Sequence, residues 1–140
     1  MSFLVERLSE LKRHLGHLES LKVRVNSSSD LEKDLSLHND VLFSLLTVCQ
    51  LVIDIAGELS ARKGERFEDY TGAVRALRSR EEFPDDLVAE LSRLPGFRNI
   101  IIHEYVALDL ERVVEAMDRL EPIERFIRIV ADLIAKETED

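Results

Sequence analysis

One long apolar segment limits what this chain can fold into. Residues 31–62 contain no proline and a single glycine, and their middle, VLFSLLTVCQLVIDIA, is apolar on nearly every side of an α-helix. A helix of that kind must lie in the centre of a fold or in an interface. At about 1.5 Å per residue it would be on the order of 45 Å long, which is long for a monomeric domain of this size. The segment therefore predicts an all-α protein built around one central helix.

The flanking segments also show helical periodicity. Leucines at spacings of three and four form one apolar stripe over roughly residues 2–25, and Ser29 or Asp30 is a candidate N-cap for the central helix. Pro95-Gly96 is expected to interrupt a later helix and Pro122 to bend the last one, because proline lacks the amide hydrogen that a helix interior needs. We predict one domain over residues 1–140, an all-α up-and-down bundle of four long helices and a short one. The later helices are expected to begin near Asp69 or Thr71, Pro84 and Asp109.

Composition indicates a cytoplasmic globular domain. Of the 140 residues, 45% are hydrophobic and 34% are charged, and the one cysteine, Cys49, excludes an internal disulfide. The N-terminal residues MSFLVERLSELKRH lack the uninterrupted apolar stretch of a signal peptide. The longest uncharged apolar segment, residues 41–53, is shorter than the roughly 20 residues that a membrane span needs. We therefore expect a cytoplasmic protein with no membrane partner and with Cys49 as a small core residue.

The charge of the chain is uneven. The formal net charge of −9 argues against a nucleic-acid partner, because phosphates are repelled by a field of that sign. Residues 61–80, however, carry a net charge of +3, which leaves −12 on the rest of the chain. This stretch is either a local basic face on an acidic body or a solvated, charged connection between helices.

The segment GFRNIIIHEY, residues 96–105, combines Arg98, His103 and Tyr105 with three consecutive isoleucines. On an α-helix Arg98 and His103 are offset by roughly 140° and do not share a face. Tyr105 would return nearly to the side of Arg98 if the helix extends that far. Two copies of the segment that meet across a dimer seam would converge on one cleft, with the isoleucines anchoring each helix.

The side chains of this segment suit phosphate chemistry. Arginine presents a planar fork that matches a phosphate group, and histidine exchanges protons near neutral pH. His103 would act as general base on a ribose 2′-hydroxyl or as general acid toward the leaving 5′-oxygen, while Arg98 would stabilise charge in the transition state. The alternative is structural: Arg98 forms an ion pair and His103 caps the end of its helix. The spacing alone does not decide between the two.

Residues 98–105, Arg-Asn-Ile-Ile-Ile-His-Glu-Tyr, resemble the Arg-Asn-x3-His-x-Tyr signature of HepT-like proteins, a toxin branch of the HEPN superfamily. The resemblance extends over nearly the whole chain and includes, in the same order, residues 53–56 (Ile-Asp-Ile-Ala), 67–77 and 94–109. One departure is visible. Where many relatives carry a histidine shortly after the Ile-Asp-Ile-Ala segment, this chain has Gly57-Glu58, which places a role for that histidine in doubt.

The resemblance implies a homodimer in which both motifs line a shared cleft, with Arg98 and His103 as the catalytic residues. It implies a metal-independent RNA endonuclease without a cofactor, the toxin of a type VII toxin–antitoxin pair. It also implies a partner, a nucleotidyltransferase antitoxin of the MntA type, which transfers AMP onto Tyr105 and so neutralises the toxin. The alternative is a non-catalytic HEPN dimer that serves as the binding subunit of a minimal nucleotidyltransferase.

Two further polar residues are candidates for supporting this site. Asp54 lies in the middle of the apolar helix, where an unpaired carboxylate is unfavourable. It either orients Arg98 or His103, or forms a plain structural hydrogen bond to another helix. Asn99 either binds phosphate or ribose beside Arg98, or is an ordinary surface asparagine. No Gly-rich phosphate loop is present, so the chain does not resemble a nucleotide-hydrolysing partner.

Overall fold

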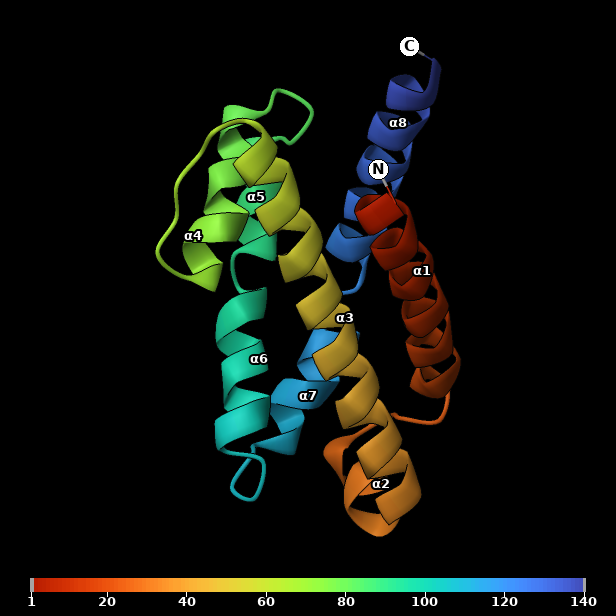
Figure 1. Ribbon diagram of the computed structural model, residues 1–140. Helices are drawn as coiled ribbons and strands as arrows, with labels where there is room; N and C mark the ends of the chain where they lie inside the picture. Colours follow the sequence, from red (N-terminus) through yellow and green to blue (C-terminus); the bar gives the residue numbers. More distant parts are fainter. Residues whose placement is uncertain (1, 140) are drawn as a thin grey trace.

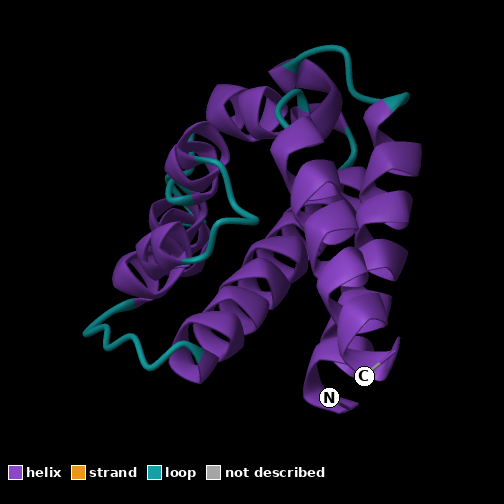
Figure 2. Ribbon diagram, turned by 90° about the horizontal axis from the view of Figure 1, so that it is seen from above, coloured by secondary structure: helices purple, strands orange, loops and turns teal. Residues whose placement is uncertain are grey.

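A computed structural model describes residues 2–139 of the chain, and side chains through residue 137. The described residues form helices joined by short loops, and they contain no strand (Figure 2). The predicted all-α bundle is confirmed. Its elements are α1 (Ser2–Lys22), α2 (Ser28–Lys33), α3 (Leu35–Arg62), α4 (Tyr70–Arg75), the 3₁₀ helix η1 (Ala76–Ser79), α5 (Asp85–Leu91), α6 (Leu94–His103), α7 (Leu110–Met117) and α8 (Glu121–Glu139).

Helix α3 runs through the middle of the molecule. Figure 1 shows α1 and α8 on one side of it and α4, α5 and α6 on the other. Val48, Val52 and Ile55 of α3 are fully buried between these two groups of helices. Burial of apolar surface on both sides of one helix is the main stabilising term that such a bundle has. The apolar central segment thus lies in the centre of the fold.

By length and composition alone, the whole of α3 could cross a membrane. The expectation of no membrane span was based on residues 41–53, which are only part of this helix. Half of its most apolar window is buried inside the fold. That burial is the pattern of a core helix, since a membrane span would need its apolar residues to face lipid.

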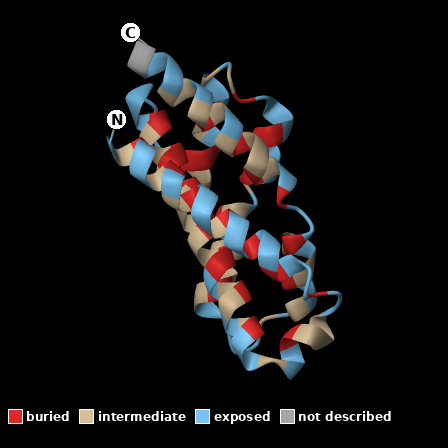
Figure 3. Cartoon of the chain, turned by 90° about the vertical axis from the view of Figure 1, so that its right-hand side faces the viewer, coloured by how far each residue is buried: buried red, intermediate tan, exposed pale blue. Residues whose placement is uncertain are grey.

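Helix α1 packs along α3 through its predicted leucine stripe, and this prediction is confirmed. Figure 3 shows buried residues along the inner faces of the helices and exposed ones on the outside. Leucine suits both requirements of such a stripe, because it favours helix and buries a large apolar side chain. The buried leucines of α1 are Leu4, Leu8, Leu11, Leu15, Leu18 and Leu21.

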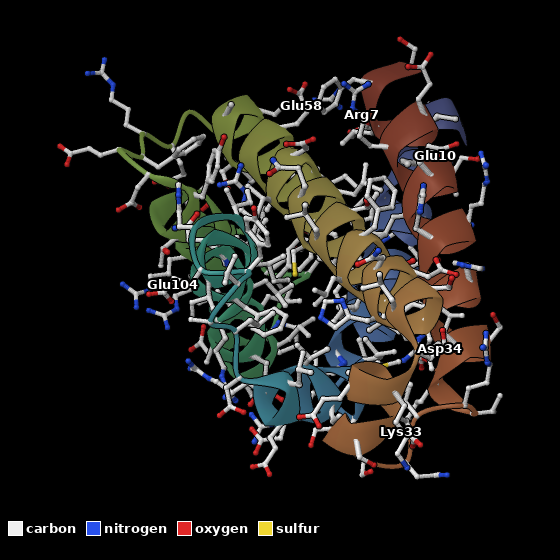
Figure 4. The ribbon with its side chains drawn as sticks, turned by 90° about the horizontal axis from the view of Figure 1, so that it is seen from below. Arg7, Glu10, Lys33, Asp34, Glu58 and Glu104 are labelled. Atoms are coloured by element: carbon white, nitrogen blue, oxygen red, sulfur yellow. The ribbon has the colours of Figure 1, made fainter. Side chains whose placement is uncertain are left out.

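The expected start of the central helix was wrong. The chain forms the short α2 first, whose N-cap is Ser27, not Ser29 or Asp30. Asp30 instead folds back, and its carboxylate accepts hydrogen bonds from the two amides before α2. Asp34 then leaves helical geometry (φ −128°, ψ 98°), and its Oδ1 accepts from the amide of Leu37 at 3.1 Å (Figure 4). A side chain that competes for backbone amides ends one helix and starts the next.

The later helices begin largely where the sequence predicted. The carboxylates of Asp69 and Asp109 cap α4 and α7 by accepting amide hydrogen bonds at 2.7 and 3.0 Å, and Pro84 is the N-cap residue of α5. The two other proline predictions were wrong. Pro95 lies in the first turn of α6, so the break precedes it, and Pro122 lies in the first turn of α8, which is a separate helix from α7. A first turn tolerates proline because its amides need no partner inside the helix.

Candidate active site

Helix α6 carries Arg98 and His103, with Tyr105 in the turn after it, and lies beside α3, running in the opposite direction (Figure 1). Its inner face is apolar: Ile101 is buried, and Phe97 packs against the core. Ile101 therefore anchors the helix, whereas Ile100 and Ile102 are only half-buried, so the expected anchoring by all three isoleucines is confirmed for Ile101 alone. Arg98 is half-buried and Asn99 is exposed.

A chain of hydrogen bonds connects Arg98 to α3. The Nε of Arg98 donates to Oε1 of Gln50 at 2.9 Å, and Nε2 of Gln50 donates to Oδ1 of Asp54 at 2.8 Å. The orientation of the Gln50 amide follows from its neighbours. An ionised carboxylate only accepts and a guanidinium only donates, so the amide nitrogen must face Asp54 and the amide oxygen must face Arg98. Asp54 thus reaches Arg98 through Gln50, one helical turn away on the same face of α3.

The guanidinium of Arg98 is held without an ion pair. Its Nη1 donates to Oδ1 of Asn99 at 2.9 Å, and its Cζ lies 5.2 Å from the centre of the Tyr70 ring. None of the ion pairs among the described side chains includes Arg98, so the structural alternative for this residue is wrong. Of the five N–H donors of a guanidinium, the two in these hydrogen bonds face neutral amide oxygens, and the other three have no partner among the described residues. The positive charge is therefore free to bind an anion.

Helix α6 ends at His103. The amide of Glu104 donates to the carbonyl of Ile100 at 2.9 Å, and the amide of Ala107 donates to the carbonyl of Glu104 at 3.0 Å. The His103 side chain is exposed and forms no hydrogen bond or ion pair with the described residues. Tyr105 follows in the turn with 65% of its surface exposed. The condition for Tyr105 to return to the side of Arg98, a helix that extends to residue 105, is not met, because the helix ends two residues earlier.

Sequence reasoning missed Gln50 as a site residue and gave Tyr70 no contact with Arg98. Gln50 is the only amide side chain in the apolar stretch of α3, and it stands four residues before Asp54. Residues at that spacing are neighbours on a helix, and glutamine pairs well with aspartate there. That spacing was the available signal. No local pattern indicated Tyr70, because its ring contacts Arg98 only when α4 and α6 pack together.

Two cavities flank this site. The larger, about 380 Å³, lies between α3, α5, α6, α7 and α8, and neither Arg98 nor His103 lines it. Cys49 lies at its wall, almost fully buried, as predicted for a core residue. Burial raises the pKa of the Cys49 thiol to about 12, against the opposing effect of the Arg98 charge. The smaller cavity, about 250 Å³, is lined by Asp54 and Tyr70, both of which belong to the surroundings of Arg98.

Comparison with known families identifies the family of the chain. The model of a family described as "Ribonuclease HepT-like" matches residues 10–130, which is most of the chain and includes the whole of α3 and α6. The chain belongs to the HepT-like ribonuclease family. Within that family, the mRNA nuclease HepT of Shewanella oneidensis is 23% identical over 129 residues, covering 91% of this chain and 95% of the relative. A second relative, from Archaeoglobus fulgidus, is 32% identical over 115 residues, covering 80% of this chain and 86% of the relative.

Solved structures show that this HepT-like chain has the HEPN fold. The tri-AMPylated HEPN toxin of Shewanella oneidensis, in complex with MNT antitoxin, superposes with a TM-score of 0.81 at 22% identity, covering 94% of this chain and 98% of the toxin. A toxin–antitoxin structure with AMP-PNP gives a TM-score of 0.79 at 22% identity, covering 93% and 98% of the two chains.

Proposed function

We propose that this HepT-like chain is a metal-independent RNA endonuclease, the cytoplasmic toxin of a type VII toxin–antitoxin pair. The observation that carries the proposal is the guanidinium of Arg98, which is held in place by Gln50 and Asn99 but left without a neutralising carboxylate. A fixed, uncompensated charge at the surface of a protein with a net charge of −9 is a local binding site for phosphate. The nuclease name of the Shewanella relative supports RNA as the substrate.

Cleavage needs only a proton carrier and a stabiliser of negative charge. The ribose 2′-oxygen attacks the adjacent phosphorus while the bond from phosphorus to the 5′-oxygen breaks, which leaves a 2′,3′-cyclic phosphate and a 5′-hydroxyl. His103 takes the 2′-hydroxyl proton as general base or gives a proton to the 5′-oxygen as general acid. Arg98 stabilises the charge that develops on the phosphate oxygens, and Asn99 lies beside it as a further contact for phosphate or ribose.

The active unit in this proposal is a homodimer. In one copy Arg98 points to α3, while His103 stands exposed at the end of α6, so a single chain does not enclose a cleft around both. A second copy facing the outer side of α3 would bring the two motifs together. Phe43 lies on that side, seven residues before Gln50 and therefore within about 20° of it around the helix. Its ring is 63% exposed, an uncovered apolar group at the place where a second copy would pack.

Tyr105 is the residue that we propose the antitoxin modifies. Its hydroxyl would attack the α-phosphorus of ATP, lose its proton and release pyrophosphate, which leaves AMP on the tyrosine. The exposed position of Tyr105 in a surface turn gives a nucleotidyltransferase of the MntA type access to it. The AMP phosphate would then compete with RNA phosphate for Arg98. The AMPylated state of the Shewanella toxin in its antitoxin complex supports this assignment.

The decisive experiment compares the purified chain with its His103→Ala variant on RNA. The wild type should cleave RNA and leave 2′,3′-cyclic phosphate ends, and the variant should be slower by about 10²-fold or more. An alanine variant as active as the wild type would overturn the assignment of His103. A folded wild type that binds the partner but does not cleave RNA would instead identify the chain as a non-catalytic binding subunit.

A further inference from the structure

The cavity of about 250 Å³ beside Arg98 has an unusual lining for a surface hollow. Aromatic rings and carboxylates share it: it is lined by Phe3, Ile53, Asp54, Gly57, Glu58, Phe67, Tyr70 and Ala73. The rings of Phe67 and Tyr70 are 39% and 45% exposed, although large aromatic groups gain most from burial. Two half-exposed rings around one hollow form a stacking surface for a flat ligand.

Gly57 keeps this hollow open. It lies inside α3, where glycine is among the least favourable residues for helix stability. Packing does not require it, because an added Cβ would meet Phe67 and Ala73 at 3.7 and 4.0 Å, which is ordinary van der Waals contact. A side chain larger than alanine here would extend further into the space bounded by the Phe67 ring.

The hollow lies beside the position proposed for the scissile phosphate. Tyr70 lines it and also lies against the Arg98 guanidinium, and Asp54 lines it and is bonded to Gln50, which holds Arg98. Helix α6 runs opposite to α3 (Figure 1), so His103 lies toward one end of α3 from Arg98, and the hollow lies toward the other. Along the helix axes, His103 and the hollow each lie about one to two helical turns from Arg98. An RNA phosphate on Arg98 would therefore have the hollow on one side and His103 on the other.

The charges of the hollow select an uncharged group that donates hydrogen bonds. One oxygen of Asp54 accepts from Gln50, and one oxygen of Glu58 accepts from Arg62 at 3.0 Å, while the second oxygen of each has no partner among the described residues. These carboxylates would repel a phosphate, but they accept hydrogen bonds from base edges. Guanine presents an N1–H and an exocyclic amine side by side, which match a carboxylate. Uracil presents one N–H between two carbonyl oxygens, which a carboxylate repels.

We propose that the hollow formed by Asp54, Gly57, Glu58, Phe67 and Tyr70 is a nucleobase subsite that stacks the base next to the cleaved phosphate and prefers guanine over uracil. The inference rests on the proposed ribonuclease function for its substrate class, RNA. It adds to that function a source of sequence preference, since Arg98 and His103 contact only backbone groups, which every nucleotide shares.

Binding of single nucleotides tests the subsite without requiring cleavage. The chain has two tyrosines, so labelling with fluorotyrosine gives two ¹⁹F signals, which Tyr70→Phe and Tyr105→Phe assign. Titration with guanosine 3′-monophosphate should shift the Tyr70 signal. Its Kd should be at least about fivefold lower than that of uridine 3′-monophosphate, because a bidentate hydrogen-bonded pair with a base edge favours the right base over the wrong one by at least about that factor. Equal affinities, or no shift of the Tyr70 signal with either nucleotide, would overturn the proposal; the second result would mean that a second copy of the chain covers the hollow.

Two variants at Gly57 form a matched pair. Gly57→Leu should fill the hollow and abolish the Tyr70 response, whereas Gly57→Ala should keep it, because its Cβ fits without displacing a neighbour. The Tyr105 signal lies outside the hollow and serves as a control for a local response, and thermal unfolding reports whether each variant is folded. If Gly57→Leu does not fold, Glu58→Gln supplies the test, and its ratio of guanosine to uridine affinity should fall toward one. An unchanged Tyr70 titration in folded Gly57→Leu, or an unchanged ratio in Glu58→Gln, contradicts the assignment.

Cleavage of an RNA pool of random sequence separates this inference from the proposed function. Wild-type chain that cleaves with guanine enriched at one position beside the cut supports both. Cleavage with no base preference overturns the subsite and leaves the ribonuclease intact. A chain that binds guanosine 3′-monophosphate through Tyr70 but cleaves nothing retains the subsite and overturns the ribonuclease.

Discussion

Replacing Gln50 by leucine tests whether the orientation of Arg98 matters for catalysis. Leucine has a similar size but removes the acceptor for Arg98 Nε and the donor for Asp54, which now bond to Gln50 at 2.9 and 2.8 Å. A hydrogen bond to a charged group contributes about 1.5–3 kcal/mol. Because both groups are half-exposed and water replaces part of the loss, we use the lower end. At about 1.4 kcal/mol per factor of ten, kcat/KM should fall by about tenfold.

A double variant separates the position of Arg98 from its charge. In Gln50→Glu with Asp54→Asn, the asparagine amide donates to the new glutamate, and the glutamate still accepts from Arg98 Nε, so the hydrogen-bond chain is preserved. The guanidinium, however, is now paired with a carboxylate and no longer free for phosphate. We expect this variant to be folded and to bind RNA more weakly, with the loss mainly in KM, while Gln50→Leu loses mainly kcat.

The assay is single-turnover and steady-state cleavage of one defined RNA at fixed ionic strength, with thermal unfolding of each variant. Salt must be fixed because phosphate contacts weaken as salt rises. Gln50→Leu should unfold within a few degrees of the wild type, since it removes only half-exposed bonds. A kcat/KM within about twofold of the wild type in folded Gln50→Leu would refute the positioning role. A double variant with wild-type KM would refute the importance of the uncompensated charge.

Four further results are expected. Arg98→Lys should be nearly as damaging to kcat/KM as Arg98→Ala, because lysine does not reproduce the planar fork; a lysine variant near wild-type activity would contradict this. EDTA should leave the cleavage rate unchanged, and its loss on chelation would contradict the proposed mechanism. Co-expression with an active nucleotidyltransferase should add whole AMP units to the wild type and none to Tyr105→Phe by intact mass, and AMP on the variant would place the acceptor elsewhere. Cys49 should resist iodoacetamide at pH 8 in the folded chain, because a thiol with a pKa of about 12 stays protonated there, and rapid alkylation would show that it is accessible.

Much of the fold could be predicted from the sequence because its signals are local. The leucine stripe of α1 and the aspartate caps of α4 and α7 depend on spacing or on one residue. The break at Asp34 was missed because an aspartate within an apolar pattern is compatible with a continuous helix as well as with a helix end. Its side chain ends α2 only because the fold allows it to cap the next helix.

The candidate site could be predicted only in part. Arg98, His103 and Tyr105 stand together in the sequence, so a motif identifies them. Two partners of Arg98, Gln50 and Tyr70, come from α3 and α4, 48 and 28 positions away in the chain, and no periodicity indicates that their side chains face it. Asp54 was identified because a carboxylate in an apolar helix is conspicuous, but its route to Arg98 through Gln50 depends on how α3 and α6 pack.

The end of α6 is important for both parts of the proposed function, RNA cleavage by this chain and AMPylation of Tyr105 by the antitoxin. Had the helix continued to Tyr105, that side chain would lie about 10 Å along the helix from Arg98, on nearly the same side. Because the helix stops at His103, the proposed proton carrier is its last residue, and Tyr105 lies in a turn closed by the hydrogen bond between Ala107 and Glu104. The same interruption that exposes His103 to a substrate thus exposes Tyr105 to a second enzyme. In the proposed function, a nucleotide added to Tyr105 would compete with RNA for Arg98 and His103, and this would silence the toxin without a rearrangement of the helices.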